Sequence, residues 1–308
     1  MKKVTTVFRL LKQAFTNLKA NDPVRMAGAT AFFSFFALPP IVIILSNVLS
    51  RLYNDRYQRV SGQFFDELAD LFGPKSANQL EDISHRLQQP KADLSLTLLG
   101  FVLLLLSSTT LFAILKNSLN QLWNIKHKEG RNLLSTLTDK LIALIIIVVS
   151  GFLFSLSLLL EQFLARAGTE FSLSSLTYYH NVVSVGNFLT SVIIRMIWFA
   201  ILFKFLPDVR IPWRAVWLGA LFTSSLFKIG EAILNRLLVH SQLGMLYGTA
   251  GAVILLLLFV FYASLIFYYG AAFTRQYTEW THLAAEPTSR AVAYTIIEDE
   301  PLDTDGKE

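Results

Sequence analysis

Three polar residues interrupt the apolar stretch at residues 213–239, and their types and spacing could do chemistry. Lys228, Glu231 and Asn235 lie at positions i, i+3 and i+7, so a helix would place all three on one face. A charged side chain near the centre of a bilayer costs roughly 3 kcal/mol or more. If this stretch crosses a membrane, these groups must face a partner helix or a wet cavity.

The apolar stretch before it carries a matching stripe. Asn187, Ser191 and Arg195 follow one another at i, i+4 and i+8, and Arg195 falls near the middle of the stretch, too deep to reach the surface easily. We expect Arg195 to meet either Glu231 or an anionic ligand. The two stripes together form what we call the polar seam: Asn187, Ser191, Arg195, Lys228, Glu231 and Asn235.

The charges of the polar seam allow two interpretations. Its two cations exceed its one carboxylate by one positive charge, which suits the headgroup, phosphate or carboxylate of an anionic substrate. Alternatively, the charged side chains neutralise one another and cross-link two helices. The sequence leaves both interpretations open.

Composition places the whole chain in a membrane. Of its 308 residues, 53% are hydrophobic and only 16% are charged, against about 25% charged in a soluble domain. Several apolar runs approach the roughly 20 residues that cross a hydrocarbon core. The absence of cysteine excludes disulfides and thiolate chemistry. We therefore expect an all-α, polytopic membrane protein.

The apolar runs predict six transmembrane helices, at about residues 26–50, 94–115, 139–160, 182–206, 213–239 and 249–273. Together with the loops between them they form a membrane domain over residues 23–278. Residues 1–22 predict a basic amphipathic helix on the cytoplasmic side, suited to an anionic leaflet. Residues 51–93 predict a small helical cap outside the membrane, and residues 279–308 a disordered cytoplasmic tail.

Two prolines lie near the middle of the first predicted transmembrane helix. Pro39 and Pro40 would break or kink it, because proline removes a backbone donor and clashes with the preceding turn. Such a break predicts a hinge of the kind found in transporters, or a packing kink without further function.

The distribution of Lys and Arg predicts the orientation. Basic residues gather in the N-terminal segment, after the second predicted helix and after the fourth, whereas the opposite short loops carry only Arg166 and Arg236. The basic residues of 51–93 run against this assignment but are outnumbered. We expect a multi-pass protein of the bacterial plasma membrane with both termini in the cytoplasm.

No pattern in the chain indicates an enzyme. The five histidines lack metal-ligand spacing, and no nucleotide-binding loop or nucleophile motif is present. We therefore predict no catalytic residues, no cofactor, no metal and no nucleic-acid partner. Ala215, Gly219 and Thr223 recur every four residues and predict close helix contact, either within the chain or in a homo-oligomer.

Several short motifs follow one another along the chain. They are Ala31-Phe32-Phe33-Ser34-Phe35-Phe36-Ala37-Leu38-Pro39-Pro40, Phe203-Lys204-Phe205-Leu206-Pro207, Pro212-Trp213-Arg214-Ala215, Gly219-Ala220-Leu221, Tyr247-Gly248-Thr249-Ala250-Gly251-Ala252-Val253 and Tyr268-Tyr269-Gly270-Ala271-Ala272-Phe273. Their order and spacing, over about residues 20 to 280, resemble those of the YihY/BrkB family of bacterial inner-membrane proteins. The first motif departs from the usual family pattern, which has a single proline preceded by Ser-Leu-Phe.

The resemblance implies six membrane spans with cytoplasmic termini, and a family suspected of exporting lipid-like compounds. Together with the polar seam, it leads us to expect a transporter or flippase-like exporter of an anionic lipid or other amphipathic small molecule. The alternative is a non-transporting scaffold that binds envelope partners through residues 51–93. A ribonuclease label attached to the family finds no support here, because a metal-dependent nuclease needs clustered ligands outside the membrane.

Overall fold

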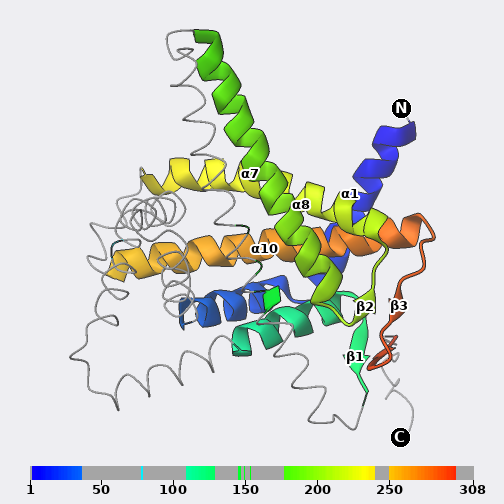
Figure 1. The fold of residues 1–308 in the computed structure, drawn as a ribbon. Helices are drawn as coiled ribbons and strands as arrows, with labels where there is room; N and C mark the ends of the chain where they lie inside the picture. Colours follow the sequence, from blue (N-terminus) through cyan, green and yellow to red (C-terminus); the bar gives the residue numbers. More distant parts are fainter. Residues whose placement is uncertain are drawn as a thin grey trace, which may run out of the picture.

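The computed structural model describes residues 2–36, 78, 109–128, 145–146, 149, 153, 177–239 and 250–295. These residues are mostly helical, as the sequence predicts, with four short strands at one end (Figure 1). Pro39 and Pro40, the cap expected at 51–93 and nearly all of the third predicted transmembrane helix lie outside the described residues.

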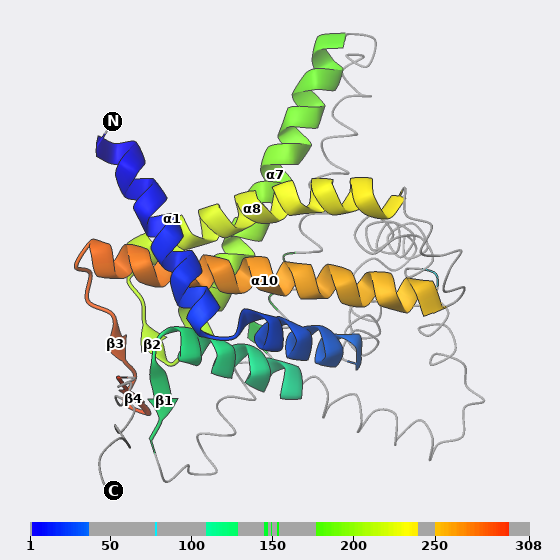
Figure 2. The same ribbon diagram turned by 180° about the vertical axis from the view of Figure 1, so that it is seen from behind.

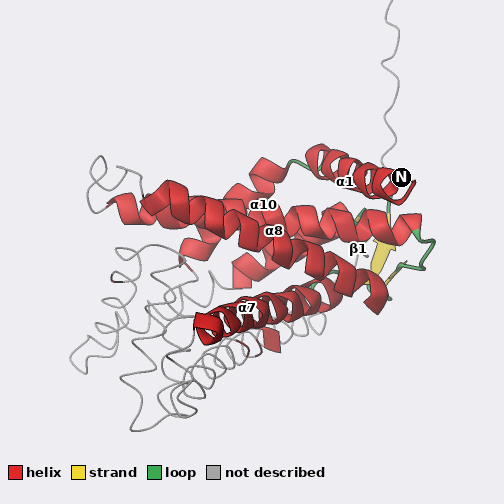
Figure 3. Ribbon diagram, turned by 90° about the horizontal axis from the view of Figure 1, so that it is seen from above, coloured by secondary structure: helices red, strands yellow, loops and turns green. Residues whose placement is uncertain are grey.

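Three long helices form the body of the described structure. They are α7 (Thr177–Phe205), α8 (Trp213–Val239) and α10 (Ala250–Trp280), and α8 packs against both of the others. Figure 3 shows α8 running beside α10, with the start of β1 near one end of the group. Within the described residues, the segment Val253–Trp280 is long and apolar enough to cross a membrane.

The packing of α8 against α10 confirms the close contact expected from small residues. A β-carbon added to Gly219 would collide with the Thr274 side chain, and one added to Gly270 would collide with Thr223. Each threonine hydroxyl donates to the carbonyl four residues earlier in its own helix, at 2.7 Å for Thr223 and 2.8 Å for Thr274. Glycine therefore permits the two antiparallel backbones to approach closely, and the threonines fill the space.

The N-terminal segment forms α1 (Lys2–Ala20), the amphipathic helix that the sequence predicts. Leu10, Ala14 and Leu18 are buried at spacings of four residues, and Figure 2 shows α1 crossing α10 near its C-terminal end. The Tyr269 hydroxyl donates to the Leu11 carbonyl at 3.1 Å, which fixes α1 to α10. One apolar face of α1 is thus bound to protein rather than only to lipid.

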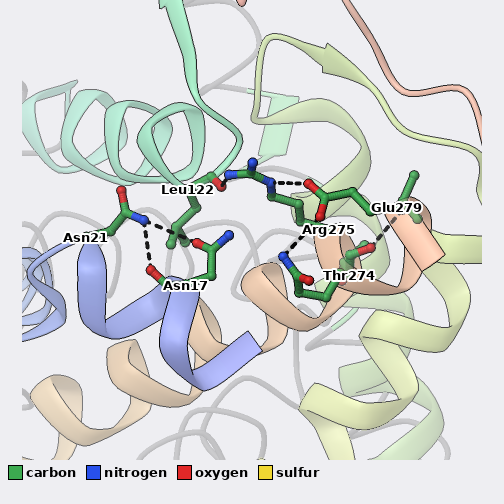
Figure 4. A network of polar contacts seen from close by, with 8 residues as sticks. Asn17, Asn21, Leu122, Thr274, Arg275 and Glu279 are labelled. Atoms are coloured by element: carbon green, nitrogen blue, oxygen red, sulfur yellow. Dashed lines mark hydrogen bonds and ion pairs between the residues drawn. The ribbon is translucent and has the colours of Figure 1, made fainter. Parts of the chain in front are cut away.

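Two further helical segments, residues 23–36 and 109–122, pack beside α10. Asp22 has a φ of 60°, a left-handed conformation that ends α1 and turns the chain into residues 23–36. The hydroxyls of Thr30 and Tyr268 lie 2.6 Å apart in the buried space between the first segment and α10. Arg275 of α10 donates to the Leu122 carbonyl and so holds the second segment (Figure 4).

Four short strands connect the end of α10 to two loops. β1 (Ile125–His127) pairs antiparallel with β4 (Ala291–Ala293), and β2 (Val209–Arg210) with β3 (Glu286–Pro287). Our expectation of disorder from residue 279 is therefore wrong for residues 279–295. The backbone of this segment finds partners in loops far away in the sequence, a pairing that composition does not reveal. Residues 296–308 lie outside the described residues.

Candidate functional site

The charged part of the polar seam is assembled between α7 and α8. Arg195 Nη1 lies 2.8 Å from Glu231 Oε2, and Lys228 Nζ lies 3.4 Å from the same oxygen. The Glu231 side chain is 11% exposed and that of Arg195 is 19% exposed, whereas Lys228 is exposed by 32%. Of the two partners expected for Arg195, the structure shows Glu231.

Aromatic side chains lie beside this ion pair. The Arg195 guanidinium sits 5.7 Å from the centre of the Phe227 ring, within range of a cation–π interaction. Phe227 in turn contacts Phe199, and Phe199 stacks on Phe203 and Phe267. Aromatic rings contributed by α7, α8 and α10 thus exclude water from one side of the charges, which strengthens the ion pair.

The hydrogen-bonding capacity of the Arg195 guanidinium is incompletely used. Nη1 is buried and close to Glu231, yet its N–H is not aligned for a hydrogen bond to any acceptor among the described residues. Two cations also share a single carboxylate, so the cluster carries a net charge of +1. A guanidinium with unused donors beside surplus positive charge can bind a phosphate or carboxylate group.

The other three predicted seam residues cannot be placed to the same detail. Asn187 and Ser191 belong to α7 and Asn235 to α8, but the side chains of all three lie outside the described part of the chain. Their contribution to the site stays a prediction.

Sequence reasoning missed a second buried ion pair, which we call the Asp208 cluster: Lys116, Asn120 and Asp208. Lys116 Nζ lies 2.9 Å from Asp208 Oδ1, and both side chains are 11% exposed. Asn120 Nδ2 donates to Asp208 Oδ2 at 2.9 Å, and the Asp208 backbone N–H donates to Asn120 Oδ1 at 2.8 Å. The cluster fastens residues 109–122 to the loop after α7.

A signal for this cluster was present in the sequence. Lys116 and Asn120 are spaced four residues apart at the end of an apolar stretch, so they share a helix face. Asp208 is an isolated acid directly after Pro207. Nothing in the local pattern pairs segments that are 88 residues apart, however, and only the three-dimensional fold brings them together.

No group of three or more histidine, aspartate or glutamate side chains in the described part of the chain could hold a metal ion. The charged groups described above can bind and orient an anion by charge and hydrogen bonding. The arrangement of Arg195, Lys228 and Glu231 offers no nucleophile with an adjacent base.

Comparison with known proteins gives one consistent result. A family model described as "Virulence factor BrkB" matches residues 14–294. A "UPF0761 membrane protein" of Teredinibacter turnerae is 24% identical over 93% of this chain and 64% of its own length. The protein of the same name from Chromohalobacter salexigens is 23% identical over 91% of this chain and 67% of its own.

A third such protein, from Tolumonas auensis, is 24% identical over 83% of this chain and 80% of its own length. The chain spans about two thirds of the length of the first two relatives, at 64% and 67%. No solved structure matches the chain.

Proposed function

Because this chain belongs to the virulence factor BrkB family, whose relatives are named membrane proteins, we propose that it moves an anionic amphipathic compound across the plasma membrane. It would act as a transporter or flippase-like exporter, with the polar seam contacting the anionic group. In the topology that we propose, the chain crosses the bacterial inner membrane six times and has both termini in the cytoplasm.

One observation carries this proposal: the cluster of Arg195, Lys228 and Glu231 between α7 and α8 has a net positive charge, and its buried Arg195 Nη1 lacks an aligned acceptor among the described residues. A purely structural pair would be neutral, with each donor matched to an acceptor, because unpaired buried charge is costly. An anionic headgroup would supply the missing acceptors, and its hydrocarbon chain could remain in the bilayer.

The arrangement of the loops supports the proposed orientation. The strand pairings bring residues 125–128, the loop between α7 and α8, and the segment after α10 to one end of the described structure (Figure 1). These segments contain Lys126, Lys128, Arg210 and Arg290, and the adjoining ends of α7 and α8 add Lys204 and Arg214. Such an accumulation is typical of the cytoplasmic side of a membrane protein.

The proposal is tested by native mass spectrometry of the protein extracted gently from its own membrane. Wild type is compared with Arg195→Ala and Lys228→Ala, and with Lys19→Ala, which removes an exposed cation on α1. We expect the wild type and Lys19→Ala to carry a stoichiometric anionic amphiphile that is lost from both seam variants, whatever other lipids remain bound.

An empty wild-type protein, or the absence of any bound amphiphile that depends on Arg195 and Lys228, would contradict ligand binding at the seam. Those outcomes would favour structural pairing and the scaffold alternative. Retention of a native circular-dichroism spectrum by the variants separates loss of binding from loss of folding.

A further inference from the structure

A groove of about 610 Å³ lies between α1, α8 and α10, on a different part of α8 from the charged seam residues. We propose that it binds one acyl chain of an anionic membrane phospholipid, whose phosphate contacts Arg214. This site is independent of the proposed transport function, because its residues do not include any member of the polar seam.

The groove is lined almost entirely by apolar side chains. Val7 and Leu10 form the α1 wall, Leu218 and Leu221 the α8 wall, and Phe273 and Trp280 the α10 wall. Its volume falls within the range of small-molecule sites, roughly 300–1,000 Å³. A hydrocarbon chain matches this lining, whereas a polar ligand would find few partners for its hydrogen bonds.

The mouth of the groove continues onto an exposed apolar stripe of α1. Val7, Phe8 and Phe15 have exposed fractions of 53%, 71% and 59%, next to the face that packs on α10. Apolar side chains of an amphipathic helix in this arrangement face the acyl region of a bilayer. An acyl chain can therefore enter the groove directly from the bilayer.

The groove lies at the depth where lipid headgroups begin. The polar face of α1 exposes Arg9, Lys12 and Lys19, which suits an anionic leaflet. Trp213 and Trp280 are also exposed, by 47% and 54%, at the start of α8 and the end of α10. Tryptophan concentrates at membrane–water interfaces, so these residues mark the boundary between headgroups and hydrocarbon.

Arg214 provides the contact for a phosphate. It precedes Leu218 by four residues and Leu221 by seven, so it shares their face of α8 and lies toward the headgroup end of the groove. Its side chain is exposed and forms no ion pair or hydrogen bond with the described residues. A guanidinium group binds phosphate through two parallel hydrogen bonds. The charge of Arg214, which is unpaired among the described residues, therefore favours an anionic phospholipid as the occupant of the groove over a second copy of the protein.

The test uses full-length protein in nanodiscs that contain equal amounts of phosphatidylglycerol and phosphatidylcholine of distinct mass, followed by native mass spectrometry. We expect the wild type to retain phosphatidylglycerol at least tenfold over phosphatidylcholine. Arg214→Gln should abolish this preference, and Leu221→Trp, which fills the groove, should remove the retained lipid. Arg214→Lys should restore part of the preference.

Matched controls change similar residues away from the groove. Lys12→Gln removes an exposed cation of α1, and Ile229→Trp enlarges an exposed apolar residue of α8 outside the groove. Both should retain phosphatidylglycerol as the wild type does, and so should the seam variant Arg195→Ala. Loss in Arg195→Ala alone would instead assign the lipid to the seam.

Equal retention of the two lipids by the wild type would overturn the proposal, as would unchanged retention in Leu221→Trp. A dimer that dissociates in Leu221→Trp without any change in lipid would also overturn it, because the groove would then hold a second copy. Size-exclusion profiles and helix content are measured on each variant to detect misfolding. If Leu221→Trp fails to fold, Arg214→Gln still tests the proposal, because this substitution is at an exposed position.

Discussion

The polar seam and the Asp208 cluster are both buried ion pairs, but they differ in balance. Among the described contacts of the Asp208 cluster, Lys116 meets Asp208, and Asn120 forms two hydrogen bonds with Asp208 at 2.9 and 2.8 Å. In the seam, Arg195 and Lys228 share Glu231, and a buried N–H of the guanidinium lacks an aligned acceptor.

This difference separates an ion pair that holds the fold from one that can bind a ligand. The Asp208 cluster pairs its charges within the protein and ties the helical residues 109–122 to the loop after α7, so it has no surplus charge for a ligand to neutralise. The seam has a surplus charge and a spare donor, so an anion could complete it. Burial alone would not have distinguished the two, because Asp208 and Glu231 are equally enclosed, at 11% exposure.

The largest expected effect is on the Asp208 cluster. Asp208→Ala leaves the Lys116 ammonium buried without its carboxylate and removes one acceptor from Asn120. We expect a loss of about 3–5 kcal/mol in the free energy of unfolding, measured by equilibrium unfolding in mild detergent. Glu286→Ala, which removes an exposed acid on β3, serves as the control. Equal behaviour of the two variants would remove the structural role assigned to this cluster.

A smaller effect is expected at Glu231, and here a ligand should reverse it. Glu231→Gln leaves Arg195 and Lys228 side by side without a carboxylate but keeps an oxygen that can accept a hydrogen bond, so the cost should be about 2 kcal/mol. Anionic lipid added to neutral detergent should recover most of this loss by binding the folded state, read as a rise in melting temperature. The same lipid should stabilise Asp208→Ala no more than it stabilises the wild type. Equal rescue of both variants would erase the distinction between the sites.

The smallest expected effect on stability is at Lys228. Its Nζ lies 3.4 Å from Glu231 and the side chain is 32% exposed, so Lys228→Met retains the neutral pair of Arg195 and Glu231. We expect the free energy of unfolding to change by less than about 1 kcal/mol, while transport of a fluorescent anionic lipid in proteoliposomes falls severalfold. Unimpaired transport in this variant would show that the surplus charge has no functional role.

Much of the described fold could be predicted from hydropathy and helix signals. The sequence predicts α8 with both of its observed ends, because Pro212 precedes the first residue of a long apolar run. It underestimates α10, which continues seven residues past the expected end at Phe273. The last turns of α10 are polar, so hydropathy does not predict that they belong to the helix. An ion pair at 2.7 Å between Arg275 and Glu279 stabilises them.

The candidate site was predictable to the extent that it depends on helix periodicity. Arg195, Lys228 and Glu231 were identified because charges in apolar helices must find partners, and the structure brings these three together. Asp208 and the strand segments at 286–287 and 291–293 were not identified. Their partners are distant in sequence, and strand pairing of two or three residues leaves almost no periodic pattern.

The glycine–threonine packing of α8 on α10 allows only one alignment of the two helices. A slide of one turn in one direction would set Thr223 opposite Thr274, and in the other it would set Gly219 opposite Gly270 and leave a void. The first shift brings two threonine side chains into collision, and the second removes packing contacts. The observed register of α8 against α10 is therefore favoured over both neighbouring registers. We therefore expect a rearrangement that opens the charged contact between Arg195 and Glu231 to move α7 relative to α8 and α10, which would move together.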